Sequence, residues 1–197
     1  MAGLSFCPDK SDTQAAVHVR NSWLSASGPE MPISEGNVIV RRAGDADVPG
    51  ILHCLAAAFE PYRASYTPAG YLDTVLTAQT LQLRLASMQI FVAVSPRNQI
   101  AGTIACSRID AGEGHLRGMA VLPEWQSTGV AERLLQAAEA ELVTQHCTCV
   151  TLDTTEPLQR AMPFYERHGY RRSGKISDFF GMRLHEYVKE LRPTSGE

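Results

Sequence analysis

The sequence predicts an α/β fold in which a mixed β-sheet carries helices on both faces. Short apolar segments typical of strands recur along the chain, and longer segments repeat apolar residues at the spacing of a helix. Some predicted strands follow one another directly, whereas others are separated by a predicted helix. Strands that follow one another directly are typically antiparallel, whereas strands joined through a helix are typically parallel. The presence of both kinds of connection indicates a mixed sheet.

The elements from residue 38 onward begin with a strand, two helical segments and three strands. Residues 38–41 (VIVR) form the first strand, and Asp47 is placed to cap a helix over residues 48–59. Residues 69–88 have a helical pattern in two pieces. The three following strands cover residues 90–94, 99–107 and 114–121, with a hairpin-like turn at residues 95–98.

The second half of the chain continues with a helix over 130–145, a strand over 149–152 and a helix over 156–168. Gly169 stands where a left-handed residue ends a helix. Pro163 lies inside the last predicted helix, where we expect it to remove one hydrogen bond and kink the helix. Two strands close the fold: one starts at residue 170, and the other covers residues 179–187.

Composition indicates one globular domain, which we assign to residues 38–197, after an irregular N-terminal extension over residues 1–37 with a short helix near 13–24. Of the 197 residues, 44% are hydrophobic, so the domain can bury a full core without disulfides. The formal net charge is -3, and the basic excess of nucleic-acid-binding proteins is absent from the sequence. We therefore expect no nucleic-acid partner.

The N-terminal sequence and the cysteines favour a cytoplasmic location. The first ten residues, MAGLSFCPDK, lack the basic and apolar regions of a secretory signal, and no apolar run approaches the roughly 20 residues of a membrane helix. The five cysteines form an odd set without repeated CxxC spacing, which is typical of reduced thiols rather than of disulfides or zinc. We expect neither a membrane contact nor a bound metal.

The junction before residue 130 is small, polar and almost uncharged (QSTGVA, residues 126–131). The first turn of a helix has unpaired N–H groups and a partly positive dipole, which suit a phosphate. Gly129 and Ala131 would let a ligand approach closely, and the hydroxyls of Ser127 and Thr128 could donate hydrogen bonds. Taken alone, Q-x-x-G-x-A is a weak motif, for which an ordinary strand-to-helix loop is the simpler interpretation.

Two longer segments change that interpretation. HLRGMAVLPEWQSTGVAERLL (115–135) and LDTTEPLQRAMPFYERHGYRRSG (152–174) together resemble the GNAT superfamily of acyl-CoA-dependent N-acyltransferases, and the order of elements agrees over about residues 38–187. The resemblance implies a mixed, mostly antiparallel sheet that is splayed at a β-bulge. It also implies acetyl-CoA (coenzyme A) as cosubstrate and a chain that can form a homodimer.

The resemblance assigns two sets of cofactor-binding residues. In the family, the pantetheine arm pairs with the backbone of the strand before the loop, and the N–H that corresponds to Val121 would face the thioester carbonyl, where negative charge develops. The pyrophosphate of coenzyme A lies on the loop and the start of the following helix. The positions in this chain are Met119, Ala120 and Val121 for the arm, and Gln126, Ser127, Thr128, Gly129, Val130 and Ala131 for the pyrophosphate.

Three residues are candidates for the proton transfers that acyl transfer to an amine requires. Many family members place a glutamate base at the position of His115, and Glu113 lies two residues earlier on the same face of the strand. Either can be the base, and either can instead be an ordinary strand or turn residue. Tyr165 matches the family's proton donor to the coenzyme A thiolate, or it packs as a core aromatic.

One family contact is missing, and the acceptor is undefined. Leu158 replaces an asparagine that often touches the pantetheine. The expected reaction is acetyl transfer to a primary amine of a small molecule or a peptide N-terminus. A non-catalytic acyl-CoA-binding sensor or interaction domain, and a general α/β binding module, stay open as alternatives. Candidates for lining the acceptor site are Tyr62, Arg63, Tyr66, Tyr71, Phe179 and Phe180.

Overall fold

The protein is described here by a computed structural model that covers residues 38–191. The expected N-terminal extension, with its short helix near residues 13–24, lies outside the described residues. Cys54, Cys106, Cys147 and Cys149 are free thiols. None of the described helices is both long and apolar enough to span a membrane.

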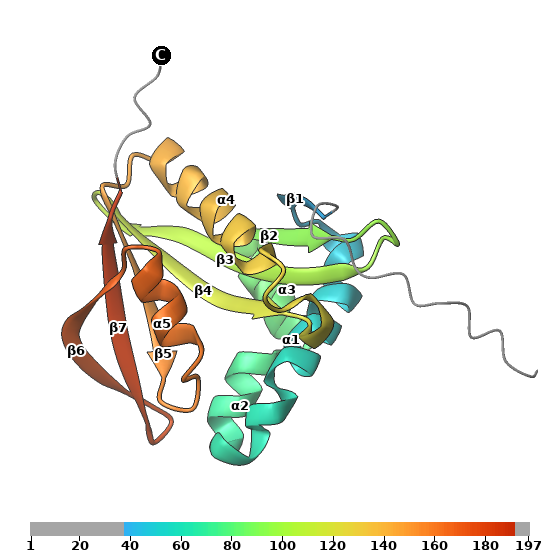
Figure 1. Ribbon diagram of the computed structural model, residues 1–197, viewed down its shortest axis with the longest axis horizontal. Helices are drawn as coiled ribbons and strands as arrows, with labels where there is room; N and C mark the ends of the chain where they lie inside the picture. The colour runs from blue at the N-terminus through green and yellow to red at the C-terminus, as the bar shows by residue number, and fades with distance from the viewer. Residues whose placement is uncertain (1–37, 192–197) are drawn as a thin grey trace, which may run out of the picture. The chain divides into compact units, whose positions relative to one another are not determined.

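Seven strands form one sheet in the order β1-β2-β3-β4-β5-β7-β6 (Figure 1). Only β4 and β5 are parallel, and all other neighbouring pairs are antiparallel. The predicted mixed, mostly antiparallel sheet is therefore confirmed. The strands are β1 (Ile39–Arg42), β2 (Gln89–Val94), β3 (Ile100–Asp110), β4 (Glu113–Val121), β5 (Cys149–Thr155), β6 (Arg171–Phe179) and β7 (Met182–Glu190).

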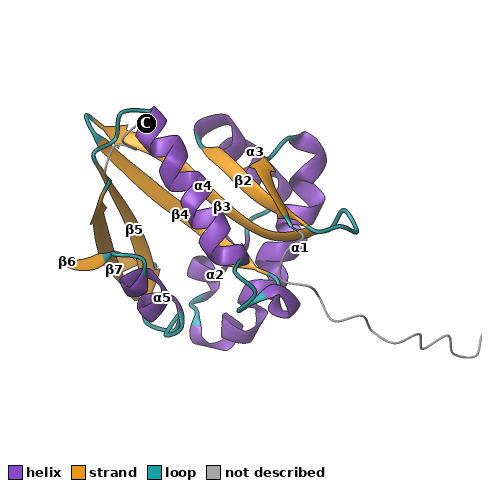
Figure 2. Cartoon of the chain, turned by 45° about the horizontal axis from the view of Figure 1, so that its top comes forward, coloured by secondary structure: helices purple, strands orange, loops and turns teal. Residues whose placement is uncertain are grey.

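Helices cover both faces of the sheet, as predicted. One face carries α1 (Val48–Phe59), α2 (Pro68–Val75) and α3 (Ala78–Ser87), and the other carries α4 (Val130–Thr144) and α5 (Ala161–Arg167) (Figures 1 and 2). The two pieces expected within residues 69–88 are α2 and α3. Both α1 and α4 pack on β3 and β4, so the middle of the sheet is buried on its two sides.

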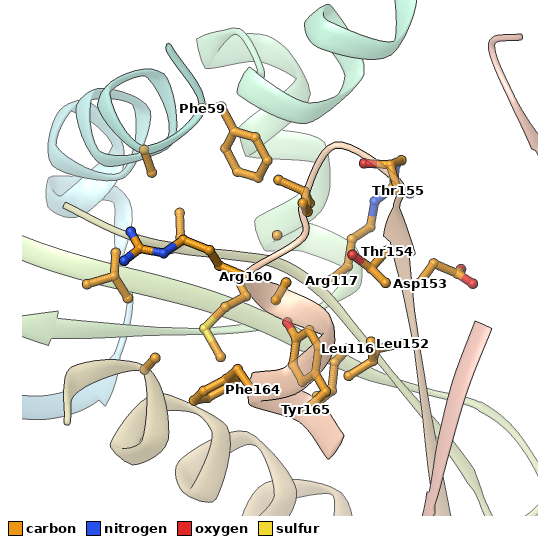
Figure 3. Close-up of a pocket in the computed structure, with 18 of the residues that line it drawn as sticks. Phe59, Leu116, Arg117, Leu152, Asp153, Thr154, Thr155, Arg160, Phe164 and Tyr165 are labelled. Carbon is orange, nitrogen blue, oxygen red and sulfur yellow. The ribbon is translucent and has the colours of Figure 1, made fainter. Parts of the chain in front are cut away.

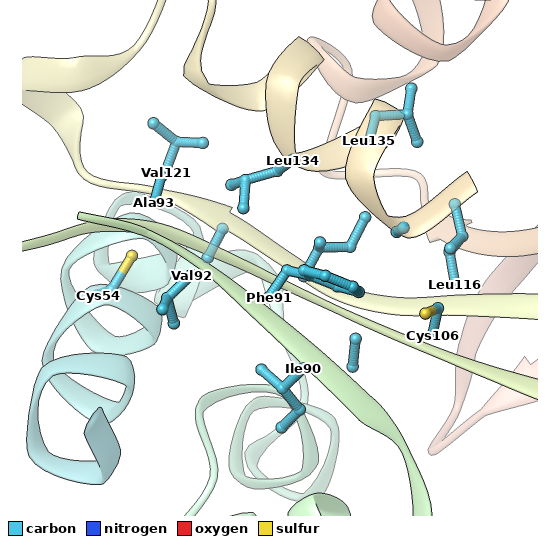
Figure 4. Packing of buried hydrophobic residues seen from close by; sticks show 14 of the residues in the cluster. Cys54, Ile90, Phe91, Val92, Ala93, Cys106, Leu116, Val121, Leu134 and Leu135 are labelled. Atoms are coloured by element: carbon cyan, nitrogen blue, oxygen red, sulfur yellow. The ribbon is translucent and has the colours of Figure 1, made fainter. Parts of the chain in front are cut away.

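The core explains why β2 is a continuous apolar run rather than an alternating one. Ile90 and Val92 point toward the α1 side, while Leu134 and Leu135 of α4 cover the opposite face (Figure 4). All four side chains are almost completely buried. A strand that is buried on both faces needs apolar residues at successive positions, and this is the sequence pattern of β2.

Two expected local features differ in the structure. Asp47 is at the start of α1, but its carboxylate accepts two hydrogen bonds from Arg41, at 2.7 and 2.8 Å, and one from the Gly44 N–H at 2.9 Å. Asp47 therefore does not cap the helix. The Arg41 guanidinium, whose charge-assisted bonds are stronger than a neutral cap, holds the pKa of this carboxyl below its usual value.

The last helix is also shorter than predicted. It begins at Ala161 rather than at residue 156, because β5 continues to Thr155, which is paired with Leu184 of β7. Pro163 is consequently the third residue of α5, within the first turn, where N–H groups have no partner inside the helix. The expected loss of a hydrogen bond and the expected kink were wrong for this reason. Gly169, with φ of 86°, ends the helix as predicted.

Candidate active site

The site is built on a separation of the two parallel strands. β4 and β5 are paired only from Glu113 to Leu116 of β4, and both strands continue beyond that point without pairing with each other. The register between β3 and β4 shifts at the same level, and Gly118 has φ of 65° in the left-handed region. A glycine in this conformation is typical of a β-bulge, which turns the second half of β4 away from β5.

A cavity of about 870 Å³ opens in this gap. Its walls come from both separated strands, from the loop before α4, from α5, and from α1 with the segment that follows it. Figure 3 shows side chains of these elements converging on the cavity, with Tyr165 below it and Phe59 above it. The volume is that of a site for a large organic ligand.

The loop before α4 forms one end of the cavity. Gly129 has φ of 81°, and a Cβ atom at this position would meet no atom within 4 Å. No side chain caps the first turn of α4, so its N–H groups stay available to a ligand. Among the predicted phosphate-binding residues, those that line the cavity are Gln126, Ser127, Gly129 and Ala131.

The other two predicted loop residues face elsewhere. The Thr128 hydroxyl donates a hydrogen bond to the Trp125 carbonyl at 2.7 Å, so the expected outward donation from this hydroxyl was wrong. Val130 is 1% exposed, and its side chain packs in the core. Neither residue lines the cavity.

The free edge of β4 presents Met119, Ala120 and Val121 to the cavity. The Leu122 N–H donates to Ala101 of the neighbouring strand at 2.9 Å. Successive N–H groups of an extended strand point in opposite directions, so the Val121 N–H points away from β3 and toward β5. The Val121 carbonyl, on the same side, accepts a hydrogen bond from the Gln126 side chain at 3.2 Å.

The two faces of β5 give the cavity two chemically different sides. Leu152 is paired with Tyr187, whose hydroxyl reaches Glu166 of α5, so Leu152 and Thr154 face α5. The alternate residues Thr151, Asp153 and Thr155 face the α1 side, where the hydroxyls of Thr155 and Tyr66 are 2.7 Å apart. The cavity therefore connects the two faces of the sheet.

His115 lies on the α1 side. Its Nδ1 atom is 3.1 Å from the Thr151 hydroxyl, and its Nε2 atom is 3.8 Å from the Asp153 carboxylate. Burial lowers the pKa of His115 below its usual value, and the charge of Asp153 opposes this effect. The imidazole is therefore neutral near pH 7 and can accept a proton.

Glu113, the other candidate base, does not line the cavity. Its carboxylate instead accepts a hydrogen bond from the Thr151 hydroxyl at 3.3 Å. The structure thus places only one of the two predicted base candidates next to the cavity.

Tyr165 lies on the α5 side. Its ring packs against Phe164 and Tyr170, with centroids 5.3 and 5.6 Å away, and its hydroxyl points into the cavity (Figure 3). Burial raises the pKa of Tyr165 above its usual value, so the phenol keeps its proton at neutral pH. The residue is both a core aromatic and a cavity-lining phenol.

Thr154 was not predicted as a site residue. It is 2% exposed, and its hydroxyl has no hydrogen-bond partner among the described residues. It lines the cavity on the same side as Tyr165. A buried hydroxyl without a partner is rare, and its position here indicates a group that is completed by a ligand.

Only some of the residues predicted to line the acceptor site do line the cavity. Tyr62, Tyr66 and Phe179 line the cavity, whereas Arg63, Tyr71 and Phe180 do not. Arg63 is exposed, lies over the Tyr71 ring and is paired with Glu60 at 3.6 Å. The arginines that do line the α1 side are Arg84 and Arg117, which the sequence analysis missed.

Comparison with known proteins agrees with this architecture. A model of the Acetyltransferase (GNAT) family matches residues 54–170, which include β4, the loop, β5 and α5. The chain belongs to the GNAT acetyltransferase family. Within residues 38–191, no group of three or more His, Cys, Asp or Glu side chains is placed to hold a metal ion in this GNAT domain.

Solved structures of other GNAT proteins share the fold at low sequence identity. A GNAT acetyltransferase from Staphylococcus aureus is 17% identical, with a TM-score of 0.65 over 79% of this chain and 99% of that chain. PaiA N-acetyltransferase from Thermoplasma acidophilum, in complex with coenzyme A, is 15% identical, with a TM-score of 0.65 over 78% and 98%. The ribosomal-protein-S18-alanine N-acetyltransferase from Escherichia coli is 16% identical, with a TM-score of 0.63 over 81% and 97%.

Proposed function

We propose that the protein is an acetyl-CoA-dependent N-acetyltransferase that transfers an acetyl group directly to a primary amine. The observation that carries this proposal is the cavity in the β4–β5 gap. It joins an uncapped helix start to a neutral histidine on one side and a protonated tyrosine on the other.

The loop and the strand edge fit the parts of coenzyme A. The open space at Gly129 and the free N–H groups of the first turn of α4 suit a diphosphate. Arg160 and Arg167 also line the cavity and can add positive charge beside the phosphates. The edge of β4 and the unpartnered hydroxyl of Thr154 offer hydrogen bonds to the amides of the pantetheine arm.

The proton transfers follow from the two sides of the cavity. The acceptor ammonium first loses a proton to solvent. The neutral amine nitrogen then forms a bond to the acetyl carbon, and His115 Nε2 takes a proton from that nitrogen. The Val121 N–H donates to the oxygen that becomes negative during the attack. When the carbon–sulfur bond breaks, Tyr165 gives its proton to the departing thiolate. Solvent then returns a proton to the tyrosine, and His115 releases the one it accepted.

The test combines binding and turnover. Calorimetry with acetyl-CoA measures cofactor binding, and free-thiol release with a panel of primary amines measures transfer, with the acetylated product identified by mass. We expect binding together with amine-dependent thiol release. Binding without thiol release from any amine would instead support the non-catalytic sensor or interaction domain. Absence of binding would reject both functions.

A further inference from the structure

Arg84 of α3 reaches the bulge that opens the cavity. A Cβ atom at Gly118 would lie 2.9 Å from Nη1 of Arg84, so the guanidinium lies directly against the bulged backbone. Arg84 lines the main cavity and also a smaller adjacent pocket of about 250 Å³. Any side chain at position 118 would displace this guanidinium, which links the position of Arg84 to the bulge.

The guanidinium of Arg84 has no partner of opposite charge. The neighbouring Arg117 forms an ion pair with Asp73, whereas the Arg84 guanidinium has no hydrogen bond or ion pair with any residue in the described range 38–191. Burial, and then the charge of Arg117, lower the pKa of Arg84 to about 10, so the group is still a cation at neutral pH. A half-buried cation without a partner is costly unless an anion completes it.

We propose that Arg84 binds a carboxylate of the acceptor, and that the acceptor is therefore a small primary amine of the amino-acid class. This inference rests on the proposed N-acetyltransferase function. A guanidinium binds a carboxylate through two parallel hydrogen bonds, so a carboxylate is the group that completes an unpartnered arginine. Asp73 stays with Arg117, so the acceptor does not have to displace an existing ion pair of Arg84.

The surroundings of Arg84 support this class of acceptor. His115 is on the same side of the sheet, and the charge of Arg117 helps to lower the pKa of its imidazole. The cavity is also lined by the aromatic residues Phe59, Tyr62 and Tyr66, which suit an apolar side chain of the acceptor.

The experiment uses the twenty common amino acids and their C-terminal amides as matched probes. Thiol release with acetyl-CoA gives KM for each probe, and the melting temperature of the protein saturated with coenzyme A reports binding without turnover. We expect at least one acid to be preferred over its amide. Arg84→Gln should raise the KM of that acid by about tenfold to a hundredfold and leave the amide unchanged.

Arg63→Gln is the matched control, because it removes the same charge from an exposed arginine that is paired with Glu60 outside the cavity. It should keep the preference for the acid. Arg84→Lys keeps the charge but loses the paired hydrogen bonds, and should recover only part of the preference. Calorimetric binding of coenzyme A to each variant shows that the fold is intact.

The outcomes separate this inference from the proposed function. Equal use of acids and amides, binding of no acid, or an acid preference that persists in Arg84→Gln would overturn the carboxylate site, even if amines are acetylated. Acids that bind through Arg84 but release no thiol with acetyl-CoA would support the carboxylate site and overturn the acetyltransferase function.

Discussion

The Nδ1 atom of His115 lies 3.1 Å from the hydroxyl oxygen of Thr151. That hydroxyl has two acceptors of its own, the Glu113 carboxylate and the Gly114 carbonyl, each at 3.3 Å. When the hydroxyl donates to either of these acceptors, it accepts from His115, and this arrangement requires the proton of the neutral ring on Nδ1. Nε2 then carries the free electron pair, which is the arrangement that a base facing the cavity needs.

His115→Ala should lower kcat by about a hundredfold or more, because a positioned base typically contributes this much. Cofactor affinity should change little, since His115 is not part of the loop. His185→Ala is the control: His185 is also a half-buried strand histidine near a carboxylate, Glu156 at 3.6 Å, but it does not line the cavity. If both variants keep the wild-type turnover, His115 is not the base.

The pH profile should respond to the charges around His115. The base acts when it is neutral, so kcat rises as the pH increases through its pKa. Asp153 raises the pKa of His115 and Arg117 lowers it. Asp153→Asn should therefore move the acidic limb of the profile to lower pH, and Arg117→Gln should move it to higher pH. A limb that stays in place in both variants would indicate a different titrating group.

Gly129→Glu should abolish coenzyme A binding, because a carboxylate would occupy the open space at the start of α4 and repel phosphates. Gly174→Glu is a close control: Gly174 has φ of 90°, and its Cβ would also meet no atom within 4 Å, but it lies in β6. Both variants carry similar backbone strain. Calorimetry should therefore show lost binding in the first and retained binding in the second, whereas retained binding in both would remove the loop from the site.

Tyr165→Phe should lower kcat by roughly a hundredfold while the affinity for coenzyme A stays within about twofold, since only the proton donor is lost. Tyr170→Phe removes another buried hydroxyl, which donates to Glu139 at 2.8 Å outside the cavity. It should lower the melting temperature rather than turnover. Unchanged turnover in Tyr165→Phe would leave Tyr165 with a packing role only.

The sequence was sufficient for elements whose patterns are local. The continuous apolar run of β2 and the two pieces of residues 69–88 needed no tertiary information. The start of α5 could not be predicted without tertiary information, because Thr155 is held in β5 by Leu184, some thirty positions away in the chain. Asp47 has the residue type of a cap, but the position of Arg41 in β1 decides its partner. Local propensity does not include such long-range competition.

Some site residues could likewise be predicted from local sequence, and others depend on tertiary structure. The loop and Tyr165 lie in segments with a motif, whereas Arg84 lies on a helix where any exposed arginine would fit the pattern equally well. In the folded protein its guanidinium lies against Gly118 in the bulge of β4, a contact between segments that are distant in the sequence. Whether Thr154 faces the cavity depends on how far β4 and β5 separate, which is a property of the folded sheet. Neither residue could be found from spacing alone.

Thr154→Val tests the separation of the strands directly, because it should have opposite effects on stability and on binding. The hydroxyl is buried without a partner, so its replacement by a methyl group of similar shape should leave the melting temperature unchanged or raise it. Affinity for coenzyme A should fall about two- to tenfold, the value of one neutral hydrogen bond. Thr155→Val is the matched control, since its hydroxyl is bonded to Tyr66, and it should lower the melting temperature. A loss of stability in Thr154→Val, with unchanged affinity, would mean that this hydroxyl serves the fold and does not face a ligand.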